Sequence, residues 1–139
     1  MTGSEPVAVQ THTAIARDLS GTPVAVSDGW ARLRLVTTQV MAADGRGLVH
    51  GGFVFSLADH AAMVAVNHPL VVLGSADVKF LRPVRVGQEL FAEARTKEVV
   101  GKKYVVSVTV VAETAAEPPV FEGEFVCFVP DRPVFDRST

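Results

Sequence analysis

The chain has 139 residues, 48% apolar and 20% charged, with 13 basic against 15 acidic side chains and a net charge of −2. This composition predicts one globular domain over residues 1–139 and argues against a nucleic-acid partner, and no apolar run is long enough to cross a bilayer. A single cysteine, Cys127, and the lack of a signal-peptide pattern favour a reducing, cytoplasmic setting. Residues 1–10 and 131–139 carry little pattern, so we expect them to be loosely ordered.

The first clear pattern in the chain is that of a β-hairpin. Residues 23–26 and 30–36 are apolar or alternate between apolar and charged types, and Asp28-Gly29 lies between them. Asp-Gly is a favoured two-residue hairpin turn because glycine adopts positive φ without strain. The preceding residues 11–18 are compatible with either a strand or a short helix.

A helix is predicted over residues 53–66, which favour helix by composition and form a run too long for a typical strand. The helix should end at Asn67-His68-Pro69, because the residue before a proline avoids helical φ and ψ. The segment is apolar almost all round, so we expect other elements to cover it on every side.

Four strands are predicted after the helix, separated by short polar or proline-containing turns, at residues 71–81, 89–100, 104–114 and 121–129. Consecutive strands joined by short turns favour antiparallel pairing. The predicted architecture is an α+β fold in which one antiparallel sheet curls round a single buried helix. Its remaining open side should meet another subunit.

The segment 48–66 holds the residues best suited to chemistry. Gly51-Gly52 directly precedes the predicted helix, where unpaired backbone N–H groups and a partial positive charge can polarise a carbonyl oxygen. Asp59 follows about two turns later in an otherwise apolar helix, where a carboxylate is costly unless it is paired or wetted. Asp59 is therefore either a general base or nucleophile, or a hydrogen-bonded structural carboxylate.

Other polar residues lie near Asp59 in the sequence. Ser56, Asp59, His60 and Met63 fall at helical spacings and form one stripe that can line a cleft. His50 is expected to orient the loop or a substrate carbonyl, whereas His60 is expected to be structural or at a subunit contact. The histidine spacings match no metal-ligand signature, so no metal site is predicted.

Basic residues form a second group of candidates. Lys79, Arg82 and Arg85 lie near the end of one predicted strand and in the turn after it. Together with Lys102-Lys103 they can meet an anionic nucleotide tail, or they form an ordinary solvated edge.

Two motifs resemble those of a known family. Residues 50–59 (HGGFVFSLAD) resemble the H-G-G-x-x-x-x-L-A-D signature of hotdog-fold acyl-CoA thioesterases of the phenylacetate-pathway type. Residues 80–87 (FLRPVRVG) resemble the F-x-R-P-x-x-x-G segment of the same family. The resemblance runs from about Trp30 to Phe128 and extends to a group of small thermophile hotdog proteins.

The resemblance implies a hotdog fold, a homodimer or homotetramer with active sites between subunits, and a CoA thioester as substrate with no further cofactor. In related thioesterases the aspartate of the motif activates water or attacks the thioester. Carried over, Asp59 is the base or nucleophile, Gly52 the oxyanion donor and His50 the orienting group. The predicted substrate-binding set consists of Gly51, Asp44, Ser56, Lys79 and Arg82.

One position departs from the family pattern. The family often has an asparagine six residues before the motif histidine, and this chain has Asp44 there. An ionised carboxylate cannot donate a hydrogen bond as an amide does, so Asp44 has another part, the loop register differs, or the catalytic interpretation is weakened.

Two other functions stay open. Residues 74–80 and 121–125 also resemble acyl-CoA-sensing hotdog domains of bacterial lipid regulators, although the chain has no segment for an attached DNA-binding domain. A non-catalytic acyl-CoA binding or sensing protein is therefore the alternative function. A hotdog hydratase-dehydratase is a weaker third, because Asp59 and His60 are adjacent rather than at the usual spacing.

Overall fold

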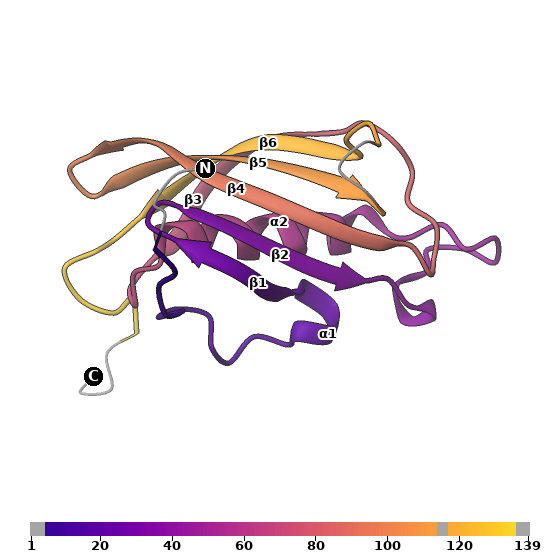
Figure 1. The fold of residues 1–139 in the computed structure, drawn as a ribbon, viewed down its shortest axis with the longest axis horizontal. Helices are drawn as coiled ribbons and strands as arrows, with labels where there is room; N and C mark the ends of the chain where they lie inside the picture. The colour runs from indigo at the N-terminus through magenta and orange to yellow at the C-terminus, as the bar shows by residue number, and fades with distance from the viewer. Residues whose placement is uncertain (1–4, 114–116, 136–139) are drawn as a thin grey trace.

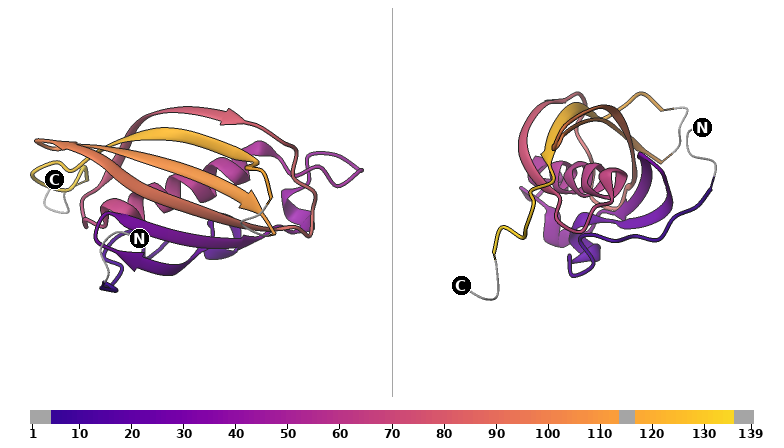
Figure 2. Two further views of the ribbon diagram at one scale, coloured as in Figure 1. Left: turned by 45° about the horizontal axis from the view of Figure 1, so that its top comes forward. Right: turned by 90° about the vertical axis from the view of Figure 1, so that its left-hand side faces the viewer.

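A computed structural model describes residues 5–113 and 117–135 of the chain. One six-stranded sheet, in the order β1-β2-β4-β5-β6-β3, curls round the long helix α2 (Figures 1 and 2). All five strand pairs are antiparallel. The predicted hotdog architecture is therefore confirmed. The strands are β1 (Thr22–Ser27), β2 (Trp30–Val36), β3 (Val72–Phe80), β4 (Glu89–Val100), β5 (Lys103–Ala112) and β6 (Phe121–Phe128).

The predicted strands are found within two residues of their expected ends, and the hairpin turn is found at Asp28-Gly29. Gly29 has φ 71°, the positive value that the turn requires. The order of strands differs from a simple run of hairpins, because β3 pairs with β6 rather than with β4. Helix α2 carries the chain across the sheet before β3 begins, so β3 joins at the far edge and β4 returns to lie beside β2 (Figure 1).

Helix α2 spans Gly51–Val66 and begins two residues earlier than predicted. It ends at Asn67, which adopts the left-handed conformation with φ 53° and donates its N–H to the Met63 carbonyl. This short polar residue tolerates that conformation, so the helix stops before Pro69 through its own cap. The residues of the helix from His60 to Ala65 are all buried.

Within one chain, the first half of α2 is not covered on every side, and the prediction left such an open side to another subunit. Gly52 is exposed, and Phe55, Ser56 and Asp59 are only partly buried. These four positions are spaced i, i+3, i+4 and i+7, so they lie along one side of the helix. The sheet does not close into a barrel, because β1 and β3 form separate edges (Figure 2). The partial exposure of the stripe agrees with a position on the side of α2 that the sheet leaves open.

The segment before β1 packs against the helix. It contains a single turn, α1 (Arg17–Ser20), where residues 11–18 were compatible with either a helix or a strand. Further upstream, the Val7 N–H donates to the Val26 carbonyl at 3.0 Å. Among the residues that the structure describes, no helix is long and apolar enough to cross a membrane.

Candidate active site

The loop before α2 presents the start of the helix to solvent. His50 is the N-cap residue and makes no side-chain capping hydrogen bond, while its own N–H donates to the Met41 carbonyl at 2.9 Å. A Cβ at Gly52 would lie 3.0 Å from the His50 ring, so glycine lets the imidazole sit close over the first helical turn. The exposed N–H groups of this turn carry the positive end of the helix dipole and suit a carbonyl oxygen or an oxyanion.

Asp59 is held in α2 without a partner for one of its oxygens. Its Oδ1 atom is buried and accepts no hydrogen bond from the described residues. Burial raises the pKa of the Asp59 carboxyl to about 6. A structural carboxylate is normally hydrogen-bonded. The unsatisfied oxygen therefore favours Asp59 as a general base or nucleophile, which binds a ligand or water, over Asp59 as a structural carboxylate.

Cys127 lies near Asp59 on the inner face of β6 and is fully buried. Burial, together with the nearby Asp59 carboxylate, raises the pKa of the Cys127 thiol to about 12. The thiol is therefore protonated at neutral pH, and it is not the thiolate that a cysteine nucleophile needs. This agrees with the assignment of Cys127 to the core.

Gly52 and Asp59 share one side of α2 but stand far apart along it. Seven residues of helix correspond to a rotation of about two turns and a rise of about 10.5 Å. A single thioester carbonyl needs a donor and a nucleophile each within about 3 Å. The Gly52 N–H and the Asp59 carboxylate of one chain therefore cannot meet on the same carbonyl.

The other predicted members of the helical stripe are separated by the fold. The Ser56 hydroxyl is 2.7 Å from the Ser20 hydroxyl, at the border with α1. His60 is buried, with Nδ1 3.1 Å from the Ser20 carbonyl, and Met63 lies in the core with 1% exposure. Only Asp59 and Ser56 of the four stay on the uncovered stripe.

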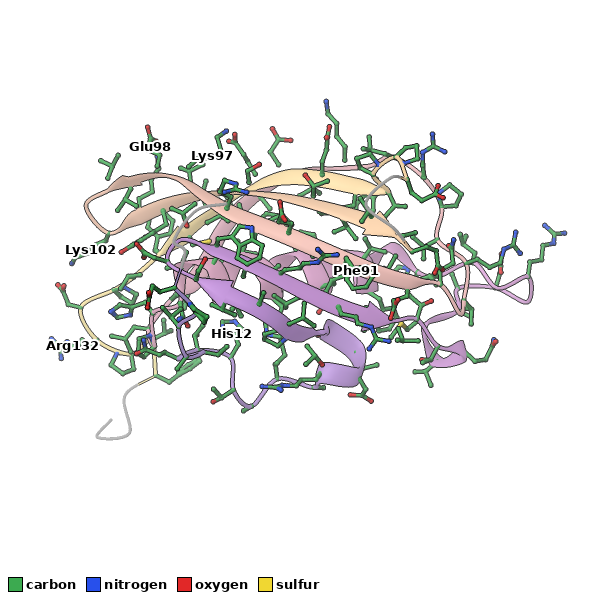
Figure 3. The ribbon with its side chains drawn as sticks, in the orientation of Figure 1. His12, Phe91, Lys97, Glu98, Lys102 and Arg132 are labelled. Carbon is green, nitrogen blue, oxygen red and sulfur yellow. The ribbon has the colours of Figure 1, made fainter. Side chains whose placement is uncertain are left out.

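His60 stacks on His12, whose ring lies over the helix from the N-terminal segment (Figure 3); the ring centroids are 6.0 Å apart. Burial lowers the pKa of both histidines. For His60, the hydrogen bond to the Ser20 carbonyl raises the pKa, while the charges of His12 and Arg17 lower it, and the net shift is downward. Protonation therefore favours the unfolded chain.

We expect the stability that the neutral histidines give to the fold to be fully present above pH 6.5, their ordinary pKa, and to be lost as the pH drops below it. The expected slope is at most about 1.4 kcal/mol per pH unit for each histidine. Urea unfolding between pH 7.5 and 5 measures it, with a His60→Gln variant as the control. A difference between the two proteins that does not change with pH would contradict this prediction.

Asp44 organises the loop before the helix. Its Oδ1 accepts hydrogen bonds from the Arg46 and Leu48 N–H groups at 2.8 and 3.2 Å. A carboxylate serves this role as well as an amide oxygen would, because both N–H groups only need an acceptor. Of the alternatives left open for Asp44, the structure therefore favours the first: Asp44 has a different role, which is to shape the loop.

An apolar cavity of about 300 Å³ opens beside the first turn of α2. We call it the helix-mouth cavity; its lining includes Leu48, Gly51, Val54, Phe80, Arg82 and Val120. Phe80 packs edge-on against Phe121 and would be 3.1 Å from a Cβ at Gly51. The cavity therefore has aromatic and aliphatic walls and one arginine at its rim, as small-molecule sites commonly do.

Lys79 is not part of this cavity. Successive residues of a strand point to opposite faces, so Lys79 turns to the outer face of the sheet when Phe80 turns towards the helix. There it lines a shallow cavity with Asp77, Glu122 and Glu124. Of the predicted substrate-binding residues, Gly51 and Arg82 come together and Lys79 lies apart from them.

Sequence reasoning did not select Phe80 or Arg46, which lie beside this site. Phe80 was part of a motif but was not assigned a role. Arg46 lies in a loop whose contacts depend on the folded chain. Among the residues that the structure describes, no group of three or more His, Cys, Asp or Glu side chains is arranged to hold a metal ion.

Comparison with family models matches residues 46–118 to the thioesterase superfamily, which is more than half of the chain. The crystal structure of the uncharacterized protein PH1136 from Pyrococcus horikoshii superposes with a TM-score of 0.91 at 48% identity, and covers 95% of this chain and 99% of that one. The motifs that suggested a hotdog fold are thus borne out at the level of family and fold.

Three curated relatives match the chain over 117, 79 and 119 residues. Methylthioribose-1-phosphate isomerase of Aquifex aeolicus is 53% identical over 117 residues, 84% of this chain and 25% of the isomerase. Transcription factor FapR of Caldanaerobacter subterraneus is 33% identical over 79 residues, 57% of this chain and 38% of that protein. The chain thus spans well under half the length of these two relatives. Acyl-coenzyme A thioesterase PaaI of Escherichia coli is 28% identical over 119 residues, 84% of each chain.

Proposed function

Because this chain belongs to the thioesterase superfamily, we propose that it hydrolyses an acyl-CoA thioester at a site shared between two copies of the chain. The observation that carries the proposal is the buried, unsatisfied oxygen of Asp59, a partly buried residue on the same side of α2 as the exposed Gly52. PaaI, a relative that covers most of this chain, is an acyl-coenzyme A thioesterase by name.

In the proposed reaction the Asp59 carboxylate takes a proton from a water molecule while the oxygen of that water attacks the thioester carbon. The Gly52 N–H donates to the carbonyl oxygen, which becomes the oxyanion of the tetrahedral intermediate. The intermediate then expels the CoA sulfur, which takes up the proton from Asp59, and the C–S bond breaks to leave a carboxylic acid. A base with a pKa of about 6 suits this step at neutral pH.

The separation along α2 leads to the requirement for two copies. Since Gly52 and Asp59 of one chain are separated by a rise of about 10.5 Å along α2, a second chain must bring its own first helical turn to the Asp59 of the first. The edge strand β3 offers a surface for this, because most of its residues are exposed and its outer edge has no strand partner among the described residues. The proposed assembly is a homodimer or homotetramer with two-fold symmetry.

The proposed activity is tested by release of free thiol from a panel of acyl-CoA thioesters of different chain length and aromatic content. We expect turnover of at least one thioester, with kcat/KM rising as the pH passes through about 6, because Asp59 must be ionised to act as a base. A profile that is flat between pH 5 and 7.5 would remove Asp59 from the role of base.

The second candidate is an acyl-CoA binding or sensing protein that does not hydrolyse its ligand. Two observations favour it: the partial match to the transcription factor FapR, and the use of Asp44 to shape the loop where the related thioesterases often have an asparagine. Calorimetry distinguishes the two candidates, since saturable binding of acyl-CoA without thiol release supports the sensor alone.

A further inference from the structure

A second cavity adjoins the helix-mouth cavity and has a different character. It measures about 290 Å³ and is lined by Arg46, Gly47, Leu48, Pro83, Val84, Arg85 and Gln88. We call it the arginine cavity. The two cavities share Leu48, Pro83 and Val84 as a common wall. Each is small for a ligand site, and together they fall within the usual range of ~300–1,000 Å³.

The arginine cavity has two arginines and no acidic residue in its lining, and the nearby Asp44 carboxylate accepts hydrogen bonds from the Arg46 and Leu48 N–H groups and not from the guanidinium groups. Neither Arg46 nor Arg85 has a carboxylate partner among the described residues, and the same holds for Arg82 at the rim of the neighbouring cavity. Three other cavities each include acidic side chains, contributed by Asp28, by Glu113 and Glu117, or by Asp77 with Glu122 and Glu124. An anion is therefore favoured in the arginine cavity over these other sites.

The two loops that carry the arginines are held together. The Val86 N–H donates to the Gly47 carbonyl at 2.8 Å, and the Val49 N–H donates to the Val84 carbonyl at 2.8 Å. The buried Thr37 hydroxyl donates to the Gln88 carbonyl at 2.7 Å and accepts from the Gly87 N–H at 3.0 Å. The backbone of the site is therefore fixed before an anion binds, and only the exposed arginine side chains have to become ordered.

We propose that the arginine cavity binds the phosphate groups of the nucleotide part of CoA, with Arg46 and Arg85 as its charged ligands, while the thioester end lies along the helix-mouth cavity. This inference rests on the proposed function for the identity of the ligand. The inference follows from the adjacency of the two cavities, because a ligand with an anionic head and a less polar tail can place its head in the arginine cavity and its tail in the helix-mouth cavity. Guanidinium groups suit this role, since each offers several N–H donors to phosphate oxygens.

The test compares binding of CoA, 4′-phosphopantetheine and pantetheine by calorimetry, so it needs no turnover. The double variant Arg46→Ala/Arg85→Ala is set against the wild type. Arg132→Ala is the control, because Arg132 is exposed and lies at the other end of the molecule from the 42–48 loop (Figures 1 and 3). A second double variant with lysine at both positions keeps the charge.

We expect the alanine double variant to bind CoA about tenfold or more weakly, with the wild-type affinity falling as salt is added. The lysine variant should retain part of the affinity, and the control should be unchanged. Pantetheine should bind all proteins equally. A phosphopantetheine affinity equal to that of CoA, with both lost in the alanine variant, would assign the cavity to the pantetheine phosphate and overturn the nucleotide assignment.

The two proposals fail in different ways. Unchanged CoA affinity in the alanine double variant overturns the arginine cavity as a phosphate site, even where acyl-CoA is hydrolysed. Arginine-dependent CoA binding without release of thiol from any acyl-CoA supports the cavity and contradicts the hydrolase. Lack of CoA binding by the wild type overturns the inference about the cavity directly.

Discussion

Replacing Asp59 with asparagine is expected to lower kcat for acyl-CoA hydrolysis by about 10²–10⁴-fold, the range that a positioned general base contributes. The amide is close in size to the carboxyl but cannot accept the proton of the attacking water. Thiol release from the best substrate of the panel measures the effect, and binding of that substrate should persist. Undiminished hydrolysis in the variant would exclude Asp59 from the mechanism.

The same substitution should make the folded chain more stable at pH 7. Burial raises the pKa of Asp59 from 3.8 to about 6, so the native state binds the proton more tightly than the unfolded chain does. The ionised carboxylate therefore lowers the free energy of unfolding. This loss grows as the pH rises from 3.8 to about 6 and is constant above pH 6. Asparagine removes this loss, which corresponds to a gain of about 1–3 kcal/mol in the free energy of unfolding.

A matched control is available in the hairpin turn. Asp28→Asn also removes one carboxylate, and Asn-Gly is as good a turn as Asp-Gly. This variant should keep full activity and show no comparable gain in stability. An Asp59→Asn protein that is both inactive and less stable than the wild type would indicate that Asp59 serves the fold.

Much of the fold could be predicted because its signals are local. The Asp28-Gly29 turn and the apolar helix each depend on residues close in sequence, and both were found where expected. The position of β3 beside β6 could not be read in this way, because pairing between distant strands is decided by the route of the chain over the helix. The uncovered stripe on α2 has the same origin, since it depends on where the two sheet edges stop.

The candidate site was predictable only in part, for a related reason. The sequence placed Gly52 at the start of the helix and Asp59 about two turns later, because both belong to one local pattern. The neighbourhood of Arg46 and Phe80 depends on hydrogen bonds between residues 35 to 39 positions apart, Val49 with Val84 and Gly47 with Val86, and no local pattern encodes those contacts. Lys79 was grouped with Arg82 by proximity in sequence, yet the alternation of strand residues turns it to the outer face.

Mixing two inactive variants is expected to restore activity, because the proposed site takes Asp59 from one chain and the first helical turn from another. Gly52→Pro removes the N–H that would donate to the oxyanion, at a position in the first turn of α2 where proline is tolerated better than in the helix interior. Alone, this variant should lose about 10²–10³-fold in kcat. Gly52→Ala keeps the N–H and serves as its control, although its Cβ displaces the His50 ring.

Unfolding and refolding Asp59→Asn and Gly52→Pro together at equal concentration forms mixed dimers. In each mixed dimer one of the two sites combines the intact Asp59 of one chain with the intact Gly52 of the other, while the second site carries both substitutions. Random pairing makes about half of the dimers mixed, so about a quarter of wild-type activity should return. Either variant refolded with itself should recover nothing. If activity after refolding together stays at the level of the separate variants, the whole site lies within a single chain. The rise of about 10.5 Å along the helix between Gly52 and Asp59 argues against that outcome.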